Sequence, residues 1–181
     1  MAYRTNALRQ PSCVGCPYNY YYHDPIPKPQ QGITMHLGER FCTGGKKAHR
    51  FKKSDPKRGV PSWCPKRKNP CEVRIYIFKS ANDRLMHLYL SDDPNNPLYP
   101  SAHRYAIAAE TTIGLTPQVF WERCQSEPPA SLMGRNIPFY SIVEIDDGLM
   151  PVFFYLTPEG VKIMHHFDAA RAQSNKREGM D

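Results

Sequence analysis

The stretch from residue 142 to residue 155 reads Ile-Val-Glu-Ile-Asp-Asp-Gly-Leu-Met-Pro-Val-Phe-Phe-Tyr. Two largely apolar runs, residues 139–146 and 149–156, flank the pair Asp147-Gly148. An Asp-Gly pair between two such runs favours a tight turn, because glycine adopts a positive φ without steric cost. The stretch therefore predicts a β-hairpin, and it points to an antiparallel sheet in the C-terminal part of the chain.

Two further segments of this part show strand patterns. Val73, Ile75 and Ile77 alternate with more polar or aromatic residues, which is the period of a strand with one buried face. Residues 104–112 are rich in β-branched and aromatic side chains and favour another strand. Residues 82–90 fit either a short helix or a strand, and both assignments stay open.

The tripeptide Leu-Thr-Pro occurs at residues 115–117 and again at residues 156–158. Threonine suits a helix N-cap and proline suits the first helical position, so both tripeptides predict helix starts. The second helix is expected to continue to about Gln173, with its apolar residues on one stripe. These elements predict a small α+β domain over residues 72–173, with a mostly antiparallel sheet, two or three helices and a polar tail at residues 174–181.

Residues 1–71 differ in composition from the rest of the chain. They hold five of the six cysteines and 14 Lys or Arg against 3 Asp or Glu, a net charge of +11. The remaining residues carry 10 against 14, a net charge of −4. Prolines make this first part loop-rich, so we expect a basic, zinc-finger-like module over residues 1–71 packed on the α+β domain. Its charge favours a phosphate-rich or acidic partner.

The cellular compartment follows from the start of the chain and from its apolar runs. Residues 1–12 lack the apolar stretch of a secretion signal, and no apolar run is long enough to span a bilayer. The expected location is the cytoplasm, with no membrane partner. Thiols stay reduced there, so the cysteines favour metal binding over a disulfide scaffold, although six is an even number.

Cys13 and Cys16 form a Cys-x2-Cys pair, and Cys42 and Cys64 follow as single residues. Four thiolates on a loop-rich segment suit a closed tetrahedral zinc site, which has a structural role because no coordination position stays open for a substrate. We therefore predict zinc on these four cysteines, with an iron–sulfur cluster as the alternative cofactor. The other candidate ligands are Cys71, His23, His36 and His49, whereas Cys124 is expected to be a core thiol.

A basic loop, residues 44–58, lies between Cys42 and Cys64 and contains seven Lys or Arg against one Asp. A loop that is anchored to a metal at both ends would present these charges on a fixed surface, which suits a phosphate backbone. Tyrosines at residues 18 and 20–22 could stack on unpaired bases, whereas Phe41, Phe51 and Trp63 are expected to form a small core around the metal. The predicted nucleic-acid-binding residues are Lys46, Lys47, Arg50, Lys52, Lys53, Lys57 and Arg58.

The sequence lacks the common signatures of nucleotide-binding and hydrolytic enzymes. Residues 44–46, Gly-Gly-Lys, lack the leading glycine and the trailing Ser or Thr of a P-loop, and no Gly-x-Ser-x-Gly or His-Glu-x-x-His motif occurs. Glu144, Asp146 and Asp168 are the candidates for a magnesium-dependent nuclease site, although the hairpin turn explains Asp146 better. We expect no catalysis, and a metal-dependent nuclease is kept as an alternative.

Three runs carry a resemblance: Arg-Phe-Cys-Thr-Gly-Gly-Lys-Lys at 40–47, Pro-Ser-Trp-Cys-Pro at 61–65 and Val143 to Tyr155. Together they resemble uncharacterised small cysteine-motif proteins of phages and other mobile elements in anaerobic bacteria, over most of the chain. This group has no activity to carry over. The resemblance implies a setting in the bacterial host cytosol, where small basic phage proteins often act on nucleic acid or on nucleoprotein defence complexes.

The functional hypothesis is a non-catalytic, zinc-stabilised protein that binds nucleic acid or a nucleoprotein effector complex. Its sharper form is an anti-CRISPR-like inhibitor of an RNA-guided defence complex. The second hypothesis is a protein–protein adaptor without nucleic acid, with the tyrosine-rich loop and Trp63 as its anchors.

Overall fold

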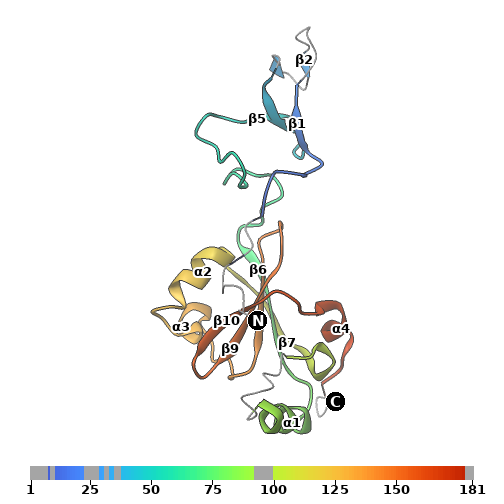
Figure 1. Ribbon diagram of the computed structural model, residues 1–181, viewed down its shortest axis with the longest axis vertical. Coiled ribbons are helices and arrows are strands. Elements are labelled where there is room, and N and C mark those ends of the chain that lie inside the picture. Colours follow the sequence, from blue (N-terminus) through green and yellow to red (C-terminus); the bar gives the residue numbers. More distant parts are fainter. Residues whose placement is uncertain are drawn as a thin grey trace, which may run out of the picture. The chain divides into compact units, whose positions relative to one another are not determined.

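The computed structural model describes residues 8, 11–22, 29–30, 33–34, 38–91 and 100–177 (Figure 1). The chain divides into two compact units. The first, called the basic unit below, is Arg9–Arg67, and the second, called the sheet unit, is Met1–Leu8 with Lys68–Asp181. The basic unit contains 12 Lys or Arg against 3 Asp or Glu, a net charge of +9, so the excess positive charge of the chain lies in it.

The sheet unit is built on a five-stranded sheet in the order β10-β9-β8-β6-β7, and every neighbouring pair is antiparallel. The expected α+β class with a mostly antiparallel sheet is therefore confirmed. The strands predicted around Val73 and over residues 104–112 are β6 and β7. The five strands are β6 (Cys71–Phe78), β7 (Tyr105–Ile113), β8 (Ile142–Asp146), β9 (Val152–Thr157) and β10 (Gly160–Met164).

The predicted hairpin is formed by β8 and β9, in a register that pairs Ile145 with Val152. Its turn is longer than an Asp-Gly pair, because residues 147–151 all lie between the strands. Gly148 has a φ of 81°, which supplies the left-handed backbone that the turn needs. The Asp146 carboxylate accepts a hydrogen bond from the Gly148 N–H at 2.8 Å, so this aspartate shapes the turn, as the sequence indicated.

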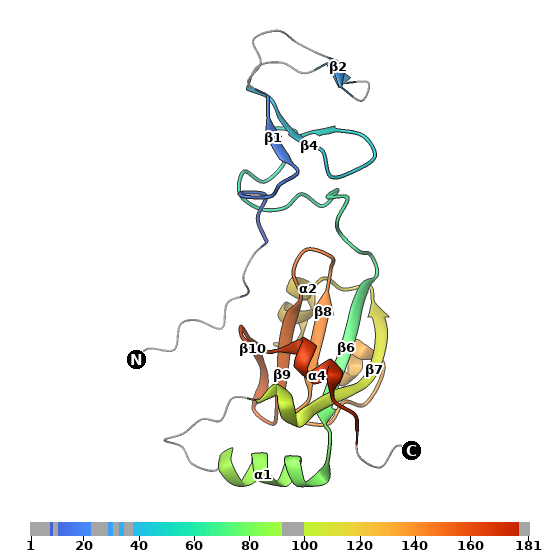
Figure 2. The ribbon, with the colours of Figure 1, turned by 90° about the vertical axis from the view of Figure 1, so that its right-hand side faces the viewer.

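Helices cover both faces of this sheet (Figures 1 and 2). α2 (Pro117–Arg123) and α3 (Pro129–Met133) lie on one face, and α4 (Ala169–Ser174) lies on the other. The ambiguous segment around residues 82–90 is a helix, α1 (Ala81–Ser91), and a short 3-10 helix, η1 (Ala102–Arg104), leads into β7. The described residues thus contain four α-helices instead of two or three. None of these helices combines the length and the apolar character that crossing a bilayer requires.

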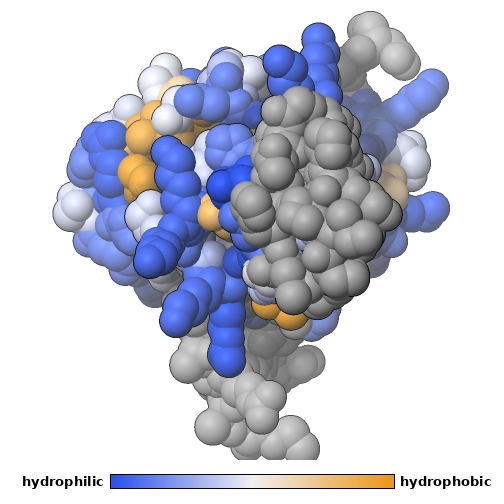
Figure 3. Space-filling view, turned by 90° about the horizontal axis from the view of Figure 1, so that it is seen from above, coloured by the Kyte–Doolittle hydropathy of each residue, from blue (hydrophilic) through white to orange (hydrophobic). Residues whose placement is uncertain are grey.

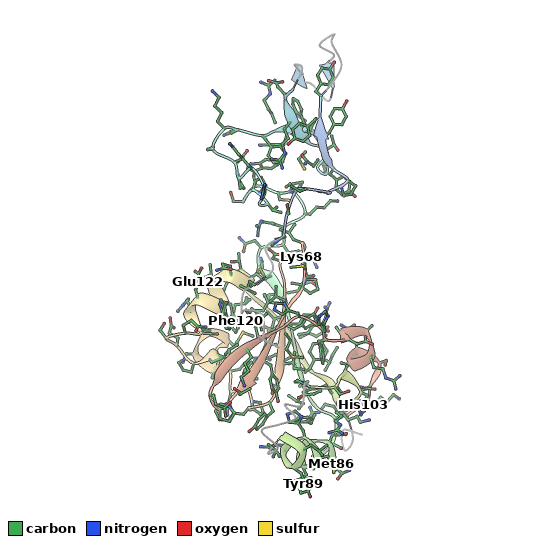
Figure 4. All side chains as sticks on the ribbon, in the orientation of Figure 1. Lys68, Met86, Tyr89, His103, Phe120 and Glu122 are labelled. Atoms are coloured by element: carbon green, nitrogen blue, oxygen red, sulfur yellow. The ribbon has the colours of Figure 1, made fainter. Side chains whose placement is uncertain are left out.

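The start predicted for α2 is confirmed. The Thr116 hydroxyl accepts a hydrogen bond from the Val119 N–H at 3.4 Å, and Pro117 occupies the first turn. This start directs Phe120 toward the sheet, where it is fully buried and its ring centre lies 5.0 Å from that of Phe154 (Figure 4). The main core of the unit forms between this helix and the inward-facing residues of β6, β8 and β9.

The helix predicted from residue 156 to Gln173 is wrong over most of its length. Thr157 donates its hydroxyl proton to the carbonyl of Gly160 at 2.9 Å, and Gly160 has a φ of 132°, so the chain reverses here. Residues 160–164 then pair with β9 as strand β10. The alternation of β-branched Val161 and Ile163 around Lys162 suits a strand, and only residues 169–174, capped by Asp168, are helical.

The basic unit contains only short strands. Its three-stranded sheet has the order β1-β4-β5, and a separate two-residue pair joins β2 to β3. A small core of Tyr22, Phe41 and Ala48 lies in this unit. Strands of two or three residues agree with the loop-rich character that its prolines predicted. They are β1 (Asn19–Tyr21), β2 (Pro29–Gln30), β3 (Ile33–Thr34), β4 (Arg40–Cys42) and β5 (His49–Arg50).

Candidate functional site

Strand pairing brings the segments of the predicted metal ligands together in the basic unit. Asn19 of β1 lies opposite Cys42 of β4, and its side-chain amide donates to the carbonyl of Cys13 at 2.9 Å. Ser12 forms an antiparallel bridge with Gly59, which brings the segment leading to Cys64 next to the segment of Cys13. Three stretches that are far apart in the sequence thus meet around the cysteines.

Local turns hold the cysteines of the first and third stretches. The Cys16 N–H donates to the Cys13 carbonyl at 3.2 Å, and the Cys64 N–H donates to the Pro61 carbonyl at 3.2 Å. Burial raises the pKa of the Cys13 thiol, the nearby Arg40 charge lowers it, and negative charge on Cys16, Cys64 or Cys42 raises it further. All three other predicted ligands are therefore close enough to Cys13 to act on it electrostatically.

The described part of the chain contains no group of three or more His, Cys, Asp or Glu side chains arranged to hold a metal ion. Zinc and its four ligands consequently stay predictions. Among the alternatives, Cys71 begins β6 in the core of the sheet unit and is 2% exposed. His49 stacks on Trp63 with 3.9 Å between ring centres, while His23 and His36 lie outside the described residues.

Cys124 lies at the end of α2, partly buried against the main core, as expected for a core thiol. Burial, with a smaller contribution from the Glu127 carboxylate, raises its pKa to about 11. The thiol is therefore protonated at neutral pH, which agrees with a packing role.

The sequence analysis missed Arg40, a cation of the basic unit that contacts three separate segments. Its Nε donates to the Asn19 side-chain oxygen at 2.9 Å, and its Nη1 donates to the Lys57 carbonyl at 3.2 Å. Its guanidinium carbon lies 3.9 Å from the centre of the Phe51 ring. Its Nη2 is buried and has no hydrogen-bond partner in the described structure. The sequence feature that could have drawn attention to Arg40 is its position two residues before Cys42, which places both side chains on one face of β4.

All seven predicted nucleic-acid-binding cations have exposed side chains. Arg50 forms an ion pair with Glu39 at 3.3 Å. The loop's acidic residue, Asp55, is used internally: its carboxylate accepts from the Lys52 N–H at 2.7 Å and from the Trp63 indole N–H at 3.0 Å. These hydrogen bonds, with the Lys52 backbone contact first, hold the pKa of Asp55 below its usual value. The carboxylate therefore shapes the loop that presents the cations.

The aromatic residues of the basic unit separate into two groups. Phe41 is fully buried, and Trp63 contacts both His49 and Phe51, so these rings pack within the unit. Their expected position around a metal stays a prediction. The packing and hydrogen bonding of Trp63 weaken its assignment as an adaptor anchor. Three tyrosines instead remain accessible to a partner: Tyr18, Tyr20 and Tyr21 expose 39%, 44% and 46% of their surface.

The three candidate nuclease carboxylates have separate structural contacts in the sheet unit. Glu144 is buried on β8 and accepts hydrogen bonds from the Tyr76 hydroxyl and from Arg74 Nη1, the latter at 2.9 Å. Asp146 accepts from Lys68 Nζ at 3.0 Å, and Asp168 caps α4. These contacts account for each carboxylate without a catalytic role.

The sheet unit exposes apolar side chains on α1. Leu85, Met86 and Tyr89 are 64%, 42% and 78% exposed, and Figure 4 labels the last two on this helix. The opposite side of α1 is held by His87, whose Nε2 lies 2.6 Å from the Tyr155 hydroxyl. A protein partner without nucleic acid would have this surface available.

The fold and the site define a two-unit α+β protein with a basic, cysteine-containing unit and an antiparallel sheet unit. Comparisons with protein-family models, with curated proteins and with solved structures each find no match to this chain. Because no match is found, the function is inferred from the charge, burial and contacts of the chain itself. Hydrophilic residues, blue in Figure 3, cover most of the coloured surface in that view.

Proposed function

We propose that the protein binds nucleic acid, free or within a nucleoprotein complex, through its basic unit and without catalysis. The observation that carries this proposal is the exposure of seven Lys and Arg side chains on a unit with a net charge of +9. Exposed cations release the counterions of phosphates when they bind, which drives association with any nucleic acid. Inhibition of an RNA-guided defence complex is the sharper form of this function.

The exposed tyrosines favour single-stranded over duplex nucleic acid as the partner. Tyr20 is 44% exposed, and its ring lies edge-to-face with that of Tyr22, with 6.5 Å between ring centres. Unpaired bases stack on such rings irrespective of sequence, at about 1–3 kcal/mol per base. Duplex DNA keeps its bases stacked internally and gains little from this ring.

We further propose that Cys13, Cys16, Cys42 and Cys64 bind zinc and stabilise the basic unit. The strand pairing that joins their three segments supports this proposal, as does the electrostatic effect of the other three thiols on Cys13. A unit of 59 residues (Arg9–Arg67) whose core cluster, among the described residues, has three buried side chains gains little stability from apolar burial alone. Metal binding supplies folding free energy in such small units.

The test is a fluorescence-anisotropy titration of the zinc-supplemented full chain with short single-stranded RNA, single-stranded DNA and duplex DNA. We expect binding to all three that falls steeply between about 50 and 200 mM salt. Replacing Tyr20 by leucine is expected to weaken single-strand binding by about 1–3 kcal/mol and to leave duplex binding nearly unchanged. Tyr89→Leu, on an exposed tyrosine of the sheet unit, is the matched control.

Two outcomes contradict these proposals in different ways. Equal losses for Tyr20→Leu and Tyr89→Leu would refute the stacking role of Tyr20 while leaving phosphate binding in place. No binding to any nucleic acid at about 50 mM salt would refute the main proposal. The adaptor hypothesis would then take its place, with the exposed side chains of α1 as the surface to mutate.

A further inference from the structure

The sheet unit contains a cavity whose charged lining residues are all cations, called the cationic cavity below. It has a volume of about 270 Å³ and lies where β6 ends, α1 begins and the chain enters β8. Lys79, Arg84 and Arg177 line it, and within the described structure their side chains form no ion pair or hydrogen bond. Asp83, in the first turn of α1, is not a lining residue, and its carboxylate accepts from the Ser80 hydroxyl at 2.6 Å. Three positive charges are therefore available to an anion.

Hydrogen bonds of the fold bring these cations together from distant segments. The Lys79 N–H donates to the Arg104 carbonyl at 2.9 Å, which fixes the backbone after β6. Asn175, two residues before Arg177, donates its side-chain amide to the Tyr105 carbonyl at 2.7 Å and so fixes the backbone after α4. Like charges that share a cavity repel one another, and an anion bound between them offsets this repulsion.

Two further features of the cavity wall favour a bound ligand. Ser141 lines the cationic cavity and is 1% exposed, and its hydroxyl forms no hydrogen bond to another described residue. Buried hydroxyls are nearly always paired, and a ligand oxygen in the cavity would supply the partner. Tyr140, next to it, has a φ of 67°, a left-handed backbone that is strained for a residue other than glycine. Such strain is concentrated at ligand-binding sites.

A second cavity, called the apolar cavity below, adjoins the first, because Arg84, Pro138 and Phe139 line both. Its volume of about 660 Å³ is in the usual range of ligand sites, and its other walls come from the end of α2, the start of α3 and the turn between β9 and β10. Its acidic lining residue, Glu127, is already paired with Arg123 at 2.8 Å. The Phe139 ring, 58% exposed, is therefore shared by a cationic and a mainly uncharged space. A ligand that joins an anionic group to a flat ring suits both.

We propose that the two cavities together bind one nucleotide, whose phosphate is held by the three cations and whose base packs against Phe139. A phosphate monoester carries about −1.5 to −2 charges at neutral pH, and guanidinium groups bind its oxygens in pairs. Aromatic rings stack on bases irrespective of base identity. A free mononucleotide and the 5′-phosphorylated end of a strand present the same groups to this site. The site lies within the sheet unit, so this inference goes beyond the binding proposed for the basic unit and does not depend on it.

The test is a calorimetric titration of the full chain with AMP, UMP, adenosine and inorganic phosphate. Both mononucleotides are expected to bind, and adenosine, which lacks the phosphate, is expected to bind at least about tenfold more weakly than AMP. Replacing Arg84 and Arg177 together by glutamine is expected to weaken AMP binding at least about tenfold. Phe139→Ala is expected to weaken it about 5- to 150-fold and to leave the binding of inorganic phosphate unchanged. The matched control replaces Lys162 and Arg171, exposed cations of the sheet unit that line neither cavity.

Single-stranded RNA with a 5′ phosphate or a 5′ hydroxyl separates the two sources of the ligand. A gain in affinity from the 5′ phosphate that is lost in the Arg84 and Arg177 variant would assign the site to strand ends. Mononucleotide binding without such a gain would assign it to free nucleotides. Equal losses in this variant and in the control would overturn the inference. So would affinities weaker than about 1 mM for both mononucleotides together with no gain from the 5′ phosphate. RNA with a 5′ hydroxyl tests the basic unit separately.

A measurement on the unmutated protein covers the case in which the variants do not fold. In NMR spectra of wild type with AMP, intermolecular NOEs are expected between the protons of the base and the ring protons of Phe139. NOEs from the base to the exposed tyrosines of the basic unit, with none to Phe139, would overturn the inference.

Discussion

Replacing Lys46, Lys47 and Lys53 together by glutamine removes three exposed charges from the basic unit. The three side chains form no ion pair or hydrogen bond within the described structure, so the substitutions leave its known contacts intact. The fold of the unit is therefore expected to persist, and the change in nucleic-acid binding reports the loss of charge.

The expected magnitude follows from the seven exposed cations of the loop. If each contacts one phosphate of duplex DNA, the slope of log affinity against log salt is about −6.3, because each contact contributes about 0.9. Three neutralised contacts reduce the slope to about −3.6. A fourfold rise in salt then weakens binding about 6,000-fold for wild type and about 150-fold for the variant.

The assay is the anisotropy titration with duplex DNA at several salt concentrations. The matched control replaces Arg135, Lys162 and Lys176 by glutamine, which removes three exposed charges from the sheet unit. The control is expected to keep the wild-type slope. An unchanged slope in the Lys46, Lys47 and Lys53 variant, or equal changes in variant and control, would refute the assignment of phosphate binding to this loop.

Two predictions concern the sheet unit. Burial first, and then the nearby Arg104 charge, hold the pKa of His87 below its usual 6.5. As the pH falls, His87 is therefore protonated in the unfolded chain at a higher pH than in the folded chain. The stability that neutral His87 contributes is fully present above about pH 6.5 and is lost as the pH falls through the folded-state pKa. Thermal denaturation is expected to show a lower melting temperature at about pH 5 than at about pH 7.5. The His87→Phe variant is expected to show a smaller difference. An equal pH dependence of wild type and variant would contradict the prediction. Glu144→Gln is expected to lower the free energy of unfolding by about 1–3 kcal/mol in urea denaturation, because Arg74 and Tyr76 lose a buried charged acceptor. The control Glu110→Gln changes the exposed ion-pair partner of Arg74 and is expected to lower the free energy of unfolding by less than about 1 kcal/mol. Similar losses in the two variants would argue against a stabilising role of the buried contacts of Glu144.

Several elements of the sheet unit could be predicted because their signals are local. The Thr116-Pro117 start of α2 satisfies its own N-cap, and the alternation in β6 matches a strand with one face in the core. The Asp147-Gly148 pair marked the hairpin correctly, although neighbouring residues lengthened its turn. The sequence does not mark the short helix α3 clearly, because Pro128 and Pro129 at its start are also typical of loops, although proline is compatible with the first turn of a helix.

In the candidate site, the sequence identified the exposed cations and the internal role of Phe41, since residue type and spacing carry those signals. The four cysteines as zinc ligands stay a prediction. It could not identify Arg40, whose partners Asn19, Phe51 and Lys57 come from three separate segments. Nor could it separate Tyr22, which is buried, from the exposed tyrosines beside it. Their exposure depends on how β1 packs against the rest of the unit.

The sequence by itself thus determined the class of the fold, the uneven distribution of charge and the elements whose caps and periodicity lie within a few residues. The tertiary structure decided the rest. Thr157-Pro158 has the chemistry of a helix start, yet residues 160–164 form a strand because β9 offers them a complete set of backbone partners. Arg40 resembles any other surface cation in the sequence, yet contacts across three segments bury one of its nitrogens. Such non-local hydrogen bonds exist only once distant segments are in place, and local propensity does not contain them.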